Sequence, residues 1–131
     1  MMNVLKKVMF IFTLLVCISA NSAVISCGYA NNNTPFKLFE TTNIWTFIKL
    51  DTRNGLMWQV QYAINDDASR FQTVLNDIPL FEGWDKESGR FTLYPTKNMY
   101  TFILLDQIDG RMWQVQWSTE AKNRGIVDVI K

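Results

Sequence analysis

The sequence of 131 residues contains no histidine, only two cysteines and three prolines, and no large excess of charge of either sign. The absence of histidine excludes Ser-His-Asp triads, histidine metal ligands and histidine proton shuttles. Thirteen basic and twelve acidic residues leave a formal net charge of +1. Since no basic surface is expected for a phosphate backbone, we do not expect nucleic-acid binding. The length allows one small domain or two very small ones.

The N-terminus is typical of a secretory signal peptide. Lys6 and Lys7 precede an apolar run over residues 8–18, and small and polar residues follow at 19–23. A basic start, a short apolar stretch and a small-residue exit are the features of such a signal, and the run is too short to span a bilayer comfortably. We therefore expect residues 1–22 to be cleaved and the mature protein to be periplasmic or extracellular.

Cys27 gives the N-terminal region a second interpretation. Residues 24–27 read Val-Ile-Ser-Cys, which resembles a bacterial lipobox, and lipidation of Cys27 would place the cleavage after residue 26. The other cysteine, Cys17, lies inside the signal, so no internal disulfide is expected in the mature chain. Soluble export and an envelope-anchored lipoprotein both remain open, and residues 23–34 are expected to form a flexible segment.

The rest of the chain contains an internal duplication, with an offset of 55 residues and no gap. Residues 36–61 read FKLFETTNIWTFIKLDTRNGLMWQVQ, and residues 91–116 read FTLYPTKNMYTFILLDQIDGRMWQVQ. Self-similarity at a fixed period indicates repeated structural units. The predicted parts are a first β repeat at 35–78, a linker at 79–89 and a second β repeat at 90–131.

Within each repeat, apolar side chains recur at every second position, and β-branched and aromatic residues dominate. A turn joins two predicted strands; it begins at Asp51 and ends at Gly55, and the second copy keeps both residues as Asp106 and Gly110. Aspartate caps such a turn, and glycine supplies the positive φ that closes it. We therefore predict an all-β fold of two homologous antiparallel units. Each is a meander of three to four strands, and the units pack as a sandwich or a blade-like pair about a pseudo-two-fold.

The expected hairpin register places Lys49 opposite Trp58, Phe47 opposite Val60 and Trp45 opposite Tyr62. These six side chains share one face of the predicted hairpin, and that face is the predicted core of the first repeat. The equivalent predicted core residues of the second repeat are Phe102, Leu104, Trp113, Val115, Tyr100 and Trp117.

The two turn aspartates, Asp51 and Asp106, have a functional alternative, because glycoside hydrolysis needs two carboxylates. Each lies beside a glycine-closed turn of its own repeat, so turn capping is the favoured interpretation. Two acidic pairs, at 66–67 and at positions 106 and 109, lack the alternating oxygen spacing of a calcium loop. We expect no metal ion and no cofactor.

The candidate ligand-binding residues are Gln59, Gln61, Gln114, Gln116 and Trp84. The glutamines share the face opposite the predicted core, and their amides both donate and accept hydrogen bonds. That chemistry suits sugar hydroxyls or a partner's backbone, although a solvated face is the simpler interpretation. Trp84 lies in the turn-rich sequence EGWDKESG, where it either anchors a partner or covers the edge of the core.

The motif L-D-x-x-x-G-x-x-W, at residues 50–58 and 105–113, resembles the inner hairpin of quinoprotein-type propeller repeats. Two units cannot close a propeller, so the resemblance implies only the shape of a blade. Over most of the mature chain, the unit RFTLYPTKNMYTFILLDQIDGRMWQVQWS resembles tandem repeats of small exported proteins from Bacteroides-type bacteria. That resemblance implies export and carries no catalytic residue.

These observations predict an exported, non-enzymatic binding or interaction module at the cell envelope or outside the cell, whose ligand is a protein or a glycan. Membrane contact is expected only through a lipid on Cys27. Exposed strand edges would allow homo-oligomers. The alternative is an exported hydrolase, or an inhibitor of one, that uses surface carboxylates.

Overall fold

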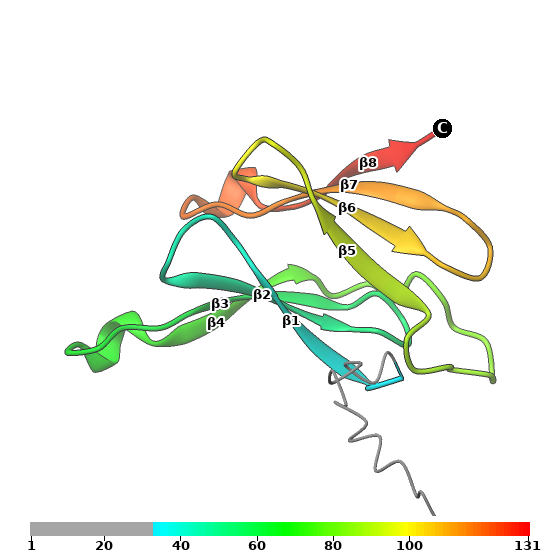
Figure 1. Cartoon of the computed structure of the whole chain (residues 1–131), viewed down its shortest axis with the longest axis horizontal. Coiled ribbons are helices and arrows are strands. Elements are labelled where there is room, and N and C mark those ends of the chain that lie inside the picture. Colours follow the sequence, from blue (N-terminus) through cyan, green and yellow to red (C-terminus); the bar gives the residue numbers. More distant parts are fainter. Residues whose placement is uncertain (1–32) are drawn as a thin grey trace, which may run out of the picture.

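The computed structural model describes residues 33–131, which form eight β-strands and two short 3-10 turns (Figure 1). The predicted signal peptide, Cys27 and most of the segment 23–34 lie outside the described residues. No helix within residues 33–131 is long and apolar enough to cross a membrane.

The strands form two four-stranded antiparallel sheets, each with its strands in sequence order. Sheet 1 consists of β1 (Phe36–Glu40), β2 (Thr46–Asp51), β3 (Met57–Gln61) and β4 (Phe71–Asn76), with η1 (Asp67–Ser69) between β3 and β4. Sheet 2 consists of β5 (Phe91–Pro95), β6 (Thr101–Asp106), β7 (Met112–Gln116) and β8 (Gly125–Ile130), with η2 (Ala121–Asn123) between β7 and β8. The predicted all-β fold of two homologous meander units packed together is confirmed.

The hairpin register is also the predicted one. Lys49 lies opposite Trp58 and Phe47 opposite Val60, and β6 and β7 repeat this pairing. Because side chains alternate between the two faces of a strand, this register determines which residues share a face.

The turns that close the two hairpins have the predicted construction. The Asp51 carboxylate accepts the backbone N–H of Arg53 at 3.0 Å, and Asp106 accepts that of Ile108 at 3.0 Å. Gly55 and Gly110 have φ values of 81° and 79°, a region that L-residues with a side chain rarely adopt. Both aspartates therefore cap their turns.

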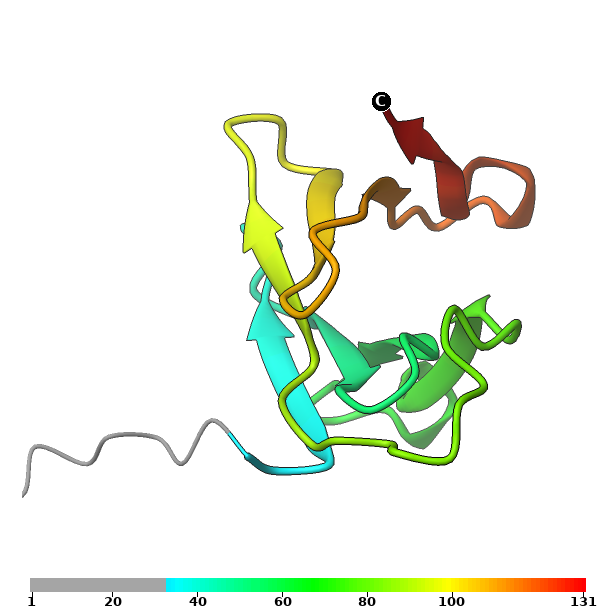
Figure 2. The same ribbon diagram turned by 90° about the vertical axis from the view of Figure 1, so that its right-hand side faces the viewer.

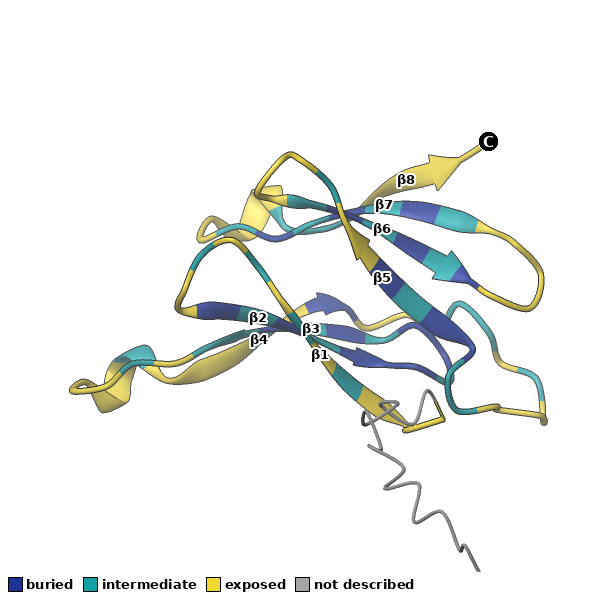
Figure 3. Cartoon of the chain, viewed as in Figure 1, coloured by how far each residue is buried: buried dark blue, intermediate teal, exposed yellow. Residues whose placement is uncertain are grey.

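The two sheets bury opposite faces against one another. Sheet 1 turns Ile48, Leu50 and Met57 inward, and all three are fully buried. Sheet 2 turns inward the other set of alternate positions, including Phe102 and Leu104. Figure 3 shows buried residues along the inner strands of both sheets, whereas β8 is mostly exposed. The predicted core face is therefore right for sheet 2 except at Tyr100, which is 44% exposed. It is wrong for sheet 1, where Phe47, Lys49, Trp58 and Val60 form the outer face and Trp45 and Tyr62 are exposed.

This arrangement also contradicts the predicted pseudo-two-fold, which would bury the same face of both repeats. The first strands, β1 and β5, lie at one edge of the stack and the fourth strands, β4 and β8, at the other (Figure 2). β2 approaches β5, and β4 approaches β8. The sheets are therefore stacked head to tail, with the front of one repeat on the back of the next.

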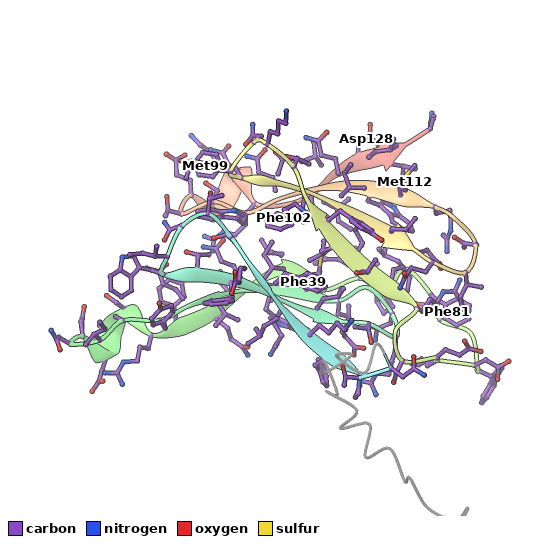
Figure 4. The ribbon with its side chains drawn as sticks, in the orientation of Figure 1. Phe39, Phe81, Met99, Phe102, Met112 and Asp128 are labelled. Atoms are coloured by element: carbon purple, nitrogen blue, oxygen red, sulfur yellow. The ribbon has the colours of Figure 1, made fainter. Side chains whose placement is uncertain are left out.

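One hydrophobic core spans both sheets. Phe39 of β1 packs against it from sheet 1, and Phe102 of β6 enters it from sheet 2 (Figure 4). Polar bonds hold the stack in register, because the Thr52 carbonyl accepts the Phe91 N–H at 2.8 Å and the Gln59 Oε1 accepts the Ser118 N–H at 3.2 Å. The stacking fixes the position of the surface features described next.

Candidate functional site

Figure 1 shows the 3-10 turn at one end of each sheet. A shallow cleft lies beside this turn in each repeat. The repeat-1 cleft has a volume of about 340 Å³, and the repeat-2 cleft about 290 Å³. Residues lining the repeat-1 cleft include Trp45, Gln61, Tyr62, Ile64, Asn65 and Ser69. Those lining the repeat-2 cleft are Tyr100, Gln116, Ser118, Thr119, Glu120 and Asn123.

The two clefts occupy equivalent positions in the duplicated sequence. Trp45 corresponds to Tyr100 at the offset of 55 residues, and Gln61 corresponds to Gln116. The two clefts therefore have an aromatic ring and a glutamine amide at equivalent positions. Two of the predicted binding residues, Gln61 and Gln116, lie in these clefts.

A recurrent loop positions the aromatic ring of each cleft. In repeat 1, the Thr41 hydroxyl donates to the carbonyl of Thr46 at 2.8 Å and accepts the N–H of Asn43 at 3.1 Å. The Asn43 side chain then accepts the N–H of Trp45 at 2.9 Å. Repeat 2 makes the same three bonds with its equivalent residues, which are Thr96, Thr101, Asn98 and Tyr100. Side chains that bond the backbone in this way fix a turn without help from the core.

A second aromatic ring supports the first one in both repeats. The rings of Trp45 and Tyr62 have centroids 5.4 Å apart, and those of Tyr100 and Trp117 are 5.1 Å apart. Trp117 is buried, and its indole N–H donates to the Met99 carbonyl at 2.8 Å. The exposed rings, Trp45 at 37% and Tyr100 at 44%, are thus held in place while one side remains open to solvent.

The amides of Gln61 and Gln116 are available to a ligand. Both residues are half-buried, and within residues 33–131 neither side chain has a hydrogen-bond partner. An amide with free donors and an acceptor at the wall of a cleft can bind a hydroxyl group in either direction.

The other predicted binding residues lie elsewhere. Gln59 is only 1% exposed between the sheets, so a ligand cannot reach it. Gln114 lies half-buried on the outer face of sheet 2. Trp84 is fully exposed, so the expectation that it covers the core edge is wrong. The linker that carries it lies at the opposite end of the sheets from η1 (Figure 1).

The turn aspartates lie in ion pairs with arginine. The guanidinium of Arg53 donates to both Asp51 oxygens, at 2.9 and 2.8 Å, and that of Arg90 does the same to Asp106 at 3.0 and 2.7 Å. Burial opposes ionisation of Asp51, but the hydrogen bonds and charge of Arg53 more than offset it, so the pKa of Asp51 lies below its ordinary value. A carboxylate held ionised in this way is suited to structure and unsuited to donating a proton.

The acidic loops near the clefts serve local structure. Asp66 accepts the backbone N–H of Ala68 at 3.0 Å and the hydroxyl of Ser69 at 2.6 Å, which caps η1. Across residues 33–131, no three cysteine, histidine or acidic side chains lie close enough to hold a metal ion.

Comparison of the chain with protein-family models, curated proteins and solved structures finds no match in any of the three.

Sequence reasoning missed the aromatic half of each cleft. It placed Trp45, Tyr62 and Tyr100 on the predicted core face, because they alternate correctly with the core residues. The available signal was the sequence Thr-x-Asn-x-aromatic, which occurs at residues 41–45 and 96–100. Its threonine and asparagine are turn formers, so the ring that follows belongs to a loop at the sheet's end.

Proposed function

We propose that the protein is an exported, non-enzymatic binding module whose ligand is a glycan, bound in the repeat-1 and repeat-2 clefts. The observation that carries this proposal is the recurrence of one cleft, made of an aromatic ring and a free amide, at equivalent places in both repeats. Export is supported by the N-terminal sequence, with its basic start and short apolar run.

The chemistry of the clefts favours a sugar ligand. An aromatic ring offers a flat apolar surface that matches the apolar face of a pyranose, and the neighbouring amide can donate to or accept from ring hydroxyls. The two volumes are at or just below the lower end of the range for small-molecule sites. A monosaccharide or the end of an oligosaccharide would fill such a cleft, whereas a protein partner would need a larger contact.

The differences between the clefts argue against catalysis. Glu120 lines the repeat-2 cleft, but its equivalent in the repeat-1 cleft is Asn65. Glycoside hydrolysis by the common mechanisms needs a pair of carboxylates in one site. The features shared by both clefts are the ring and the amide, which bind and orient a ligand without transferring protons.

The test uses the protein recovered after expression of the full chain, applied to an array of neutral and acidic oligosaccharides. The best-bound oligosaccharide is then titrated calorimetrically, and we expect two sites per chain. Trp45→Ala should remove one site and Tyr100→Ala the other. Gln61→Ala should weaken the first site by about 2- to 10-fold, as expected for the loss of one hydrogen bond.

Trp84→Ala is the matched control, because Trp84 is the most exposed tryptophan and lies outside both clefts. It should leave binding unchanged. All four variants should keep nearly the wild-type melting temperature, since none removes a fully buried side chain. An array without any bound oligosaccharide, or full binding by the Trp45→Ala/Tyr100→Ala double variant, would contradict the proposal; so would selective capture of a protein through the clefts.

A further inference from the structure

The outer face of sheet 1 contains the same residue positions that sheet 2 buries. Phe36 is 49% exposed and Leu38 is 62% exposed, whereas their equivalents Phe91 and Leu93 are 1% and 3% exposed in the core. Phe47, Trp58 and Val60 extend this outer face across the sheet. Sheet 1 therefore exposes to solvent an apolar face, and the equivalent face of sheet 2 is buried in the core.

The outer face of sheet 2 shows the complementary relation. Its half-buried residues are Ile103, Leu105 and Met112, and their equivalents in sheet 1 are fully buried. Figure 4 shows Met112 and Asp128 on the side of sheet 2 that is turned away from sheet 1. This outer face thus repeats the surface that sheet 1 turns toward sheet 2.

We propose that the outer face of sheet 1 binds the outer face of sheet 2 of a second copy of this chain, repeating between chains the contact made between the two sheets within one chain. The internal contact supports this proposal, because it shows that the two kinds of face fit together when they are stacked head to tail. The proposed contact uses sheet faces and leaves the strand edges unpaired.

A contact between two different faces is heterologous. Each such contact rotates one chain relative to the next, and the chains close into a ring when a whole number of these rotations makes a full turn. Four-stranded sheets stacked face to face close into rings of four to eight members. With two sheets per chain, the closed assembly contains two, three or four chains. Closure covers every outer face, whereas a single chain leaves two of them exposed.

The clefts are compatible with this assembly, and both outer faces carry a charge. Lys49, whose ammonium lies 4.4 Å from the centroid of the Trp58 ring, occupies on the outer face of sheet 1 the position of the buried Leu104, so its ammonium needs an acidic partner in the contact. Asp128 is an acidic residue on the outer face of sheet 2. The repeat-2 cleft stays open although sheet 2 is packed on sheet 1, so the same contact between chains leaves the repeat-1 cleft open as well. The inference is independent of the proposed glycan binding.

The test is sedimentation of the protein, recovered after expression of the full chain, over roughly 1 to 100 µM, which covers micromolar dissociation constants. Leu38→Arg blocks the outer face of sheet 1, and Ile103→Arg blocks that of sheet 2. Tyr94→Arg is a second variant of the sheet 2 face; Tyr94 is 51% exposed, so it tolerates a charge without loss of the fold. Ile108→Arg, at a 56% exposed position in the β6–β7 turn, is the matched control.

We expect the wild type and Ile108→Arg to form one species of two, three or four chains. Leu38→Arg should be monomeric. Ile103→Arg and Tyr94→Arg, which each block the other face, should also be monomeric. A one-to-one mixture of Leu38→Arg with either sheet 2 variant should form a dimer, because each partner retains the face that the other needs. The proposal is overturned if the wild type is monomeric or forms an open-ended range of sizes. It is also overturned if a variant with one blocked face remains dimeric, or if the mixture of two folded variants stays monomeric.

Discussion

Replacing Arg90 with methionine is expected to lower the free energy of unfolding by about 3–5 kcal/mol. Its guanidinium binds both oxygens of Asp106, and the two side chains are only 7% and 0% exposed. It also stacks on the Phe81 ring, with its central carbon 3.6 Å from the ring centroid. Removing the cation leaves a carboxylate inside the protein without its main partner.

Arg53→Met is the matched control for this prediction. Arg53 makes the equivalent two-point contact with Asp51, but its side chain is 36% exposed. Water can therefore replace the lost guanidinium, and the expected cost is about 1 kcal/mol or less. Urea unfolding of both variants measures the difference, and equal costs would show that Arg90 is more accessible to water than the structure indicates.

Trp113→Ala is expected to cost about 3–5 kcal/mol, whereas Trp58→Ala should cost about 1 kcal/mol. The two residues occupy the same place in the two repeats. Trp113 is 5% exposed and packs beside Phe91 in the core. Trp58 lies on the outer face of sheet 1, where the Lys49 ammonium stacks over its ring, and a surface contact of that type is worth about 0.5–1 kcal/mol.

Both variants should be compared by urea unfolding of dilute protein, so that contacts between chains do not add to the result. Far-UV circular dichroism before unfolding provides the control for an intact fold. If Trp58→Ala proves as costly as Trp113→Ala, then both repeats bury the same face and the head-to-tail stack is wrong.

Much of the fold could be predicted from local sequence. Alternation of apolar residues located the strands, and the turn from Asp51 to Gly55 set the register, since aspartate caps and glycine closes such a turn. Lys49 and Trp58 accordingly lie opposite each other as expected.

The choice of buried face could not be predicted in the same way. Both faces of each sheet carry apolar side chains, and the repeats are nearly identical there: Met57 and Met112 belong to the same five-residue sequence. Yet Met57 is fully buried and Met112 is half-buried. Burial at these positions depends on which sheet lies next to which, and local sequence carries no information about that order.

The candidate site was predicted only in part, because the stacking of the sheets also decides which glutamines a ligand can reach. Gln61 and Gln116 lie at the ends of their strands, where the face opposite the predicted core reaches a loop, and both line a cleft. Gln59 has the same side-chain chemistry two residues earlier, but the stack of sheets covers it. The ion pair of Arg90 with Asp106 joins the end of the linker to a turn, and no spacing rule in the sequence indicates that contact.

The head-to-tail stack is tested most directly by the pair Ile48→Ala and Ile103→Ala, which are equivalent positions on the faces opposite the two tryptophans. Ile48 is fully buried between the sheets, whereas Ile103 is half-buried on an outer face. In urea unfolding of dilute protein, we predict a cost of about 2–5 kcal/mol for Ile48→Ala and about 1 kcal/mol for Ile103→Ala. The larger cost then falls in repeat 1 for isoleucine and in repeat 2 for tryptophan. Equal costs for the two isoleucine variants, or a larger cost for Ile103→Ala, would contradict the stack.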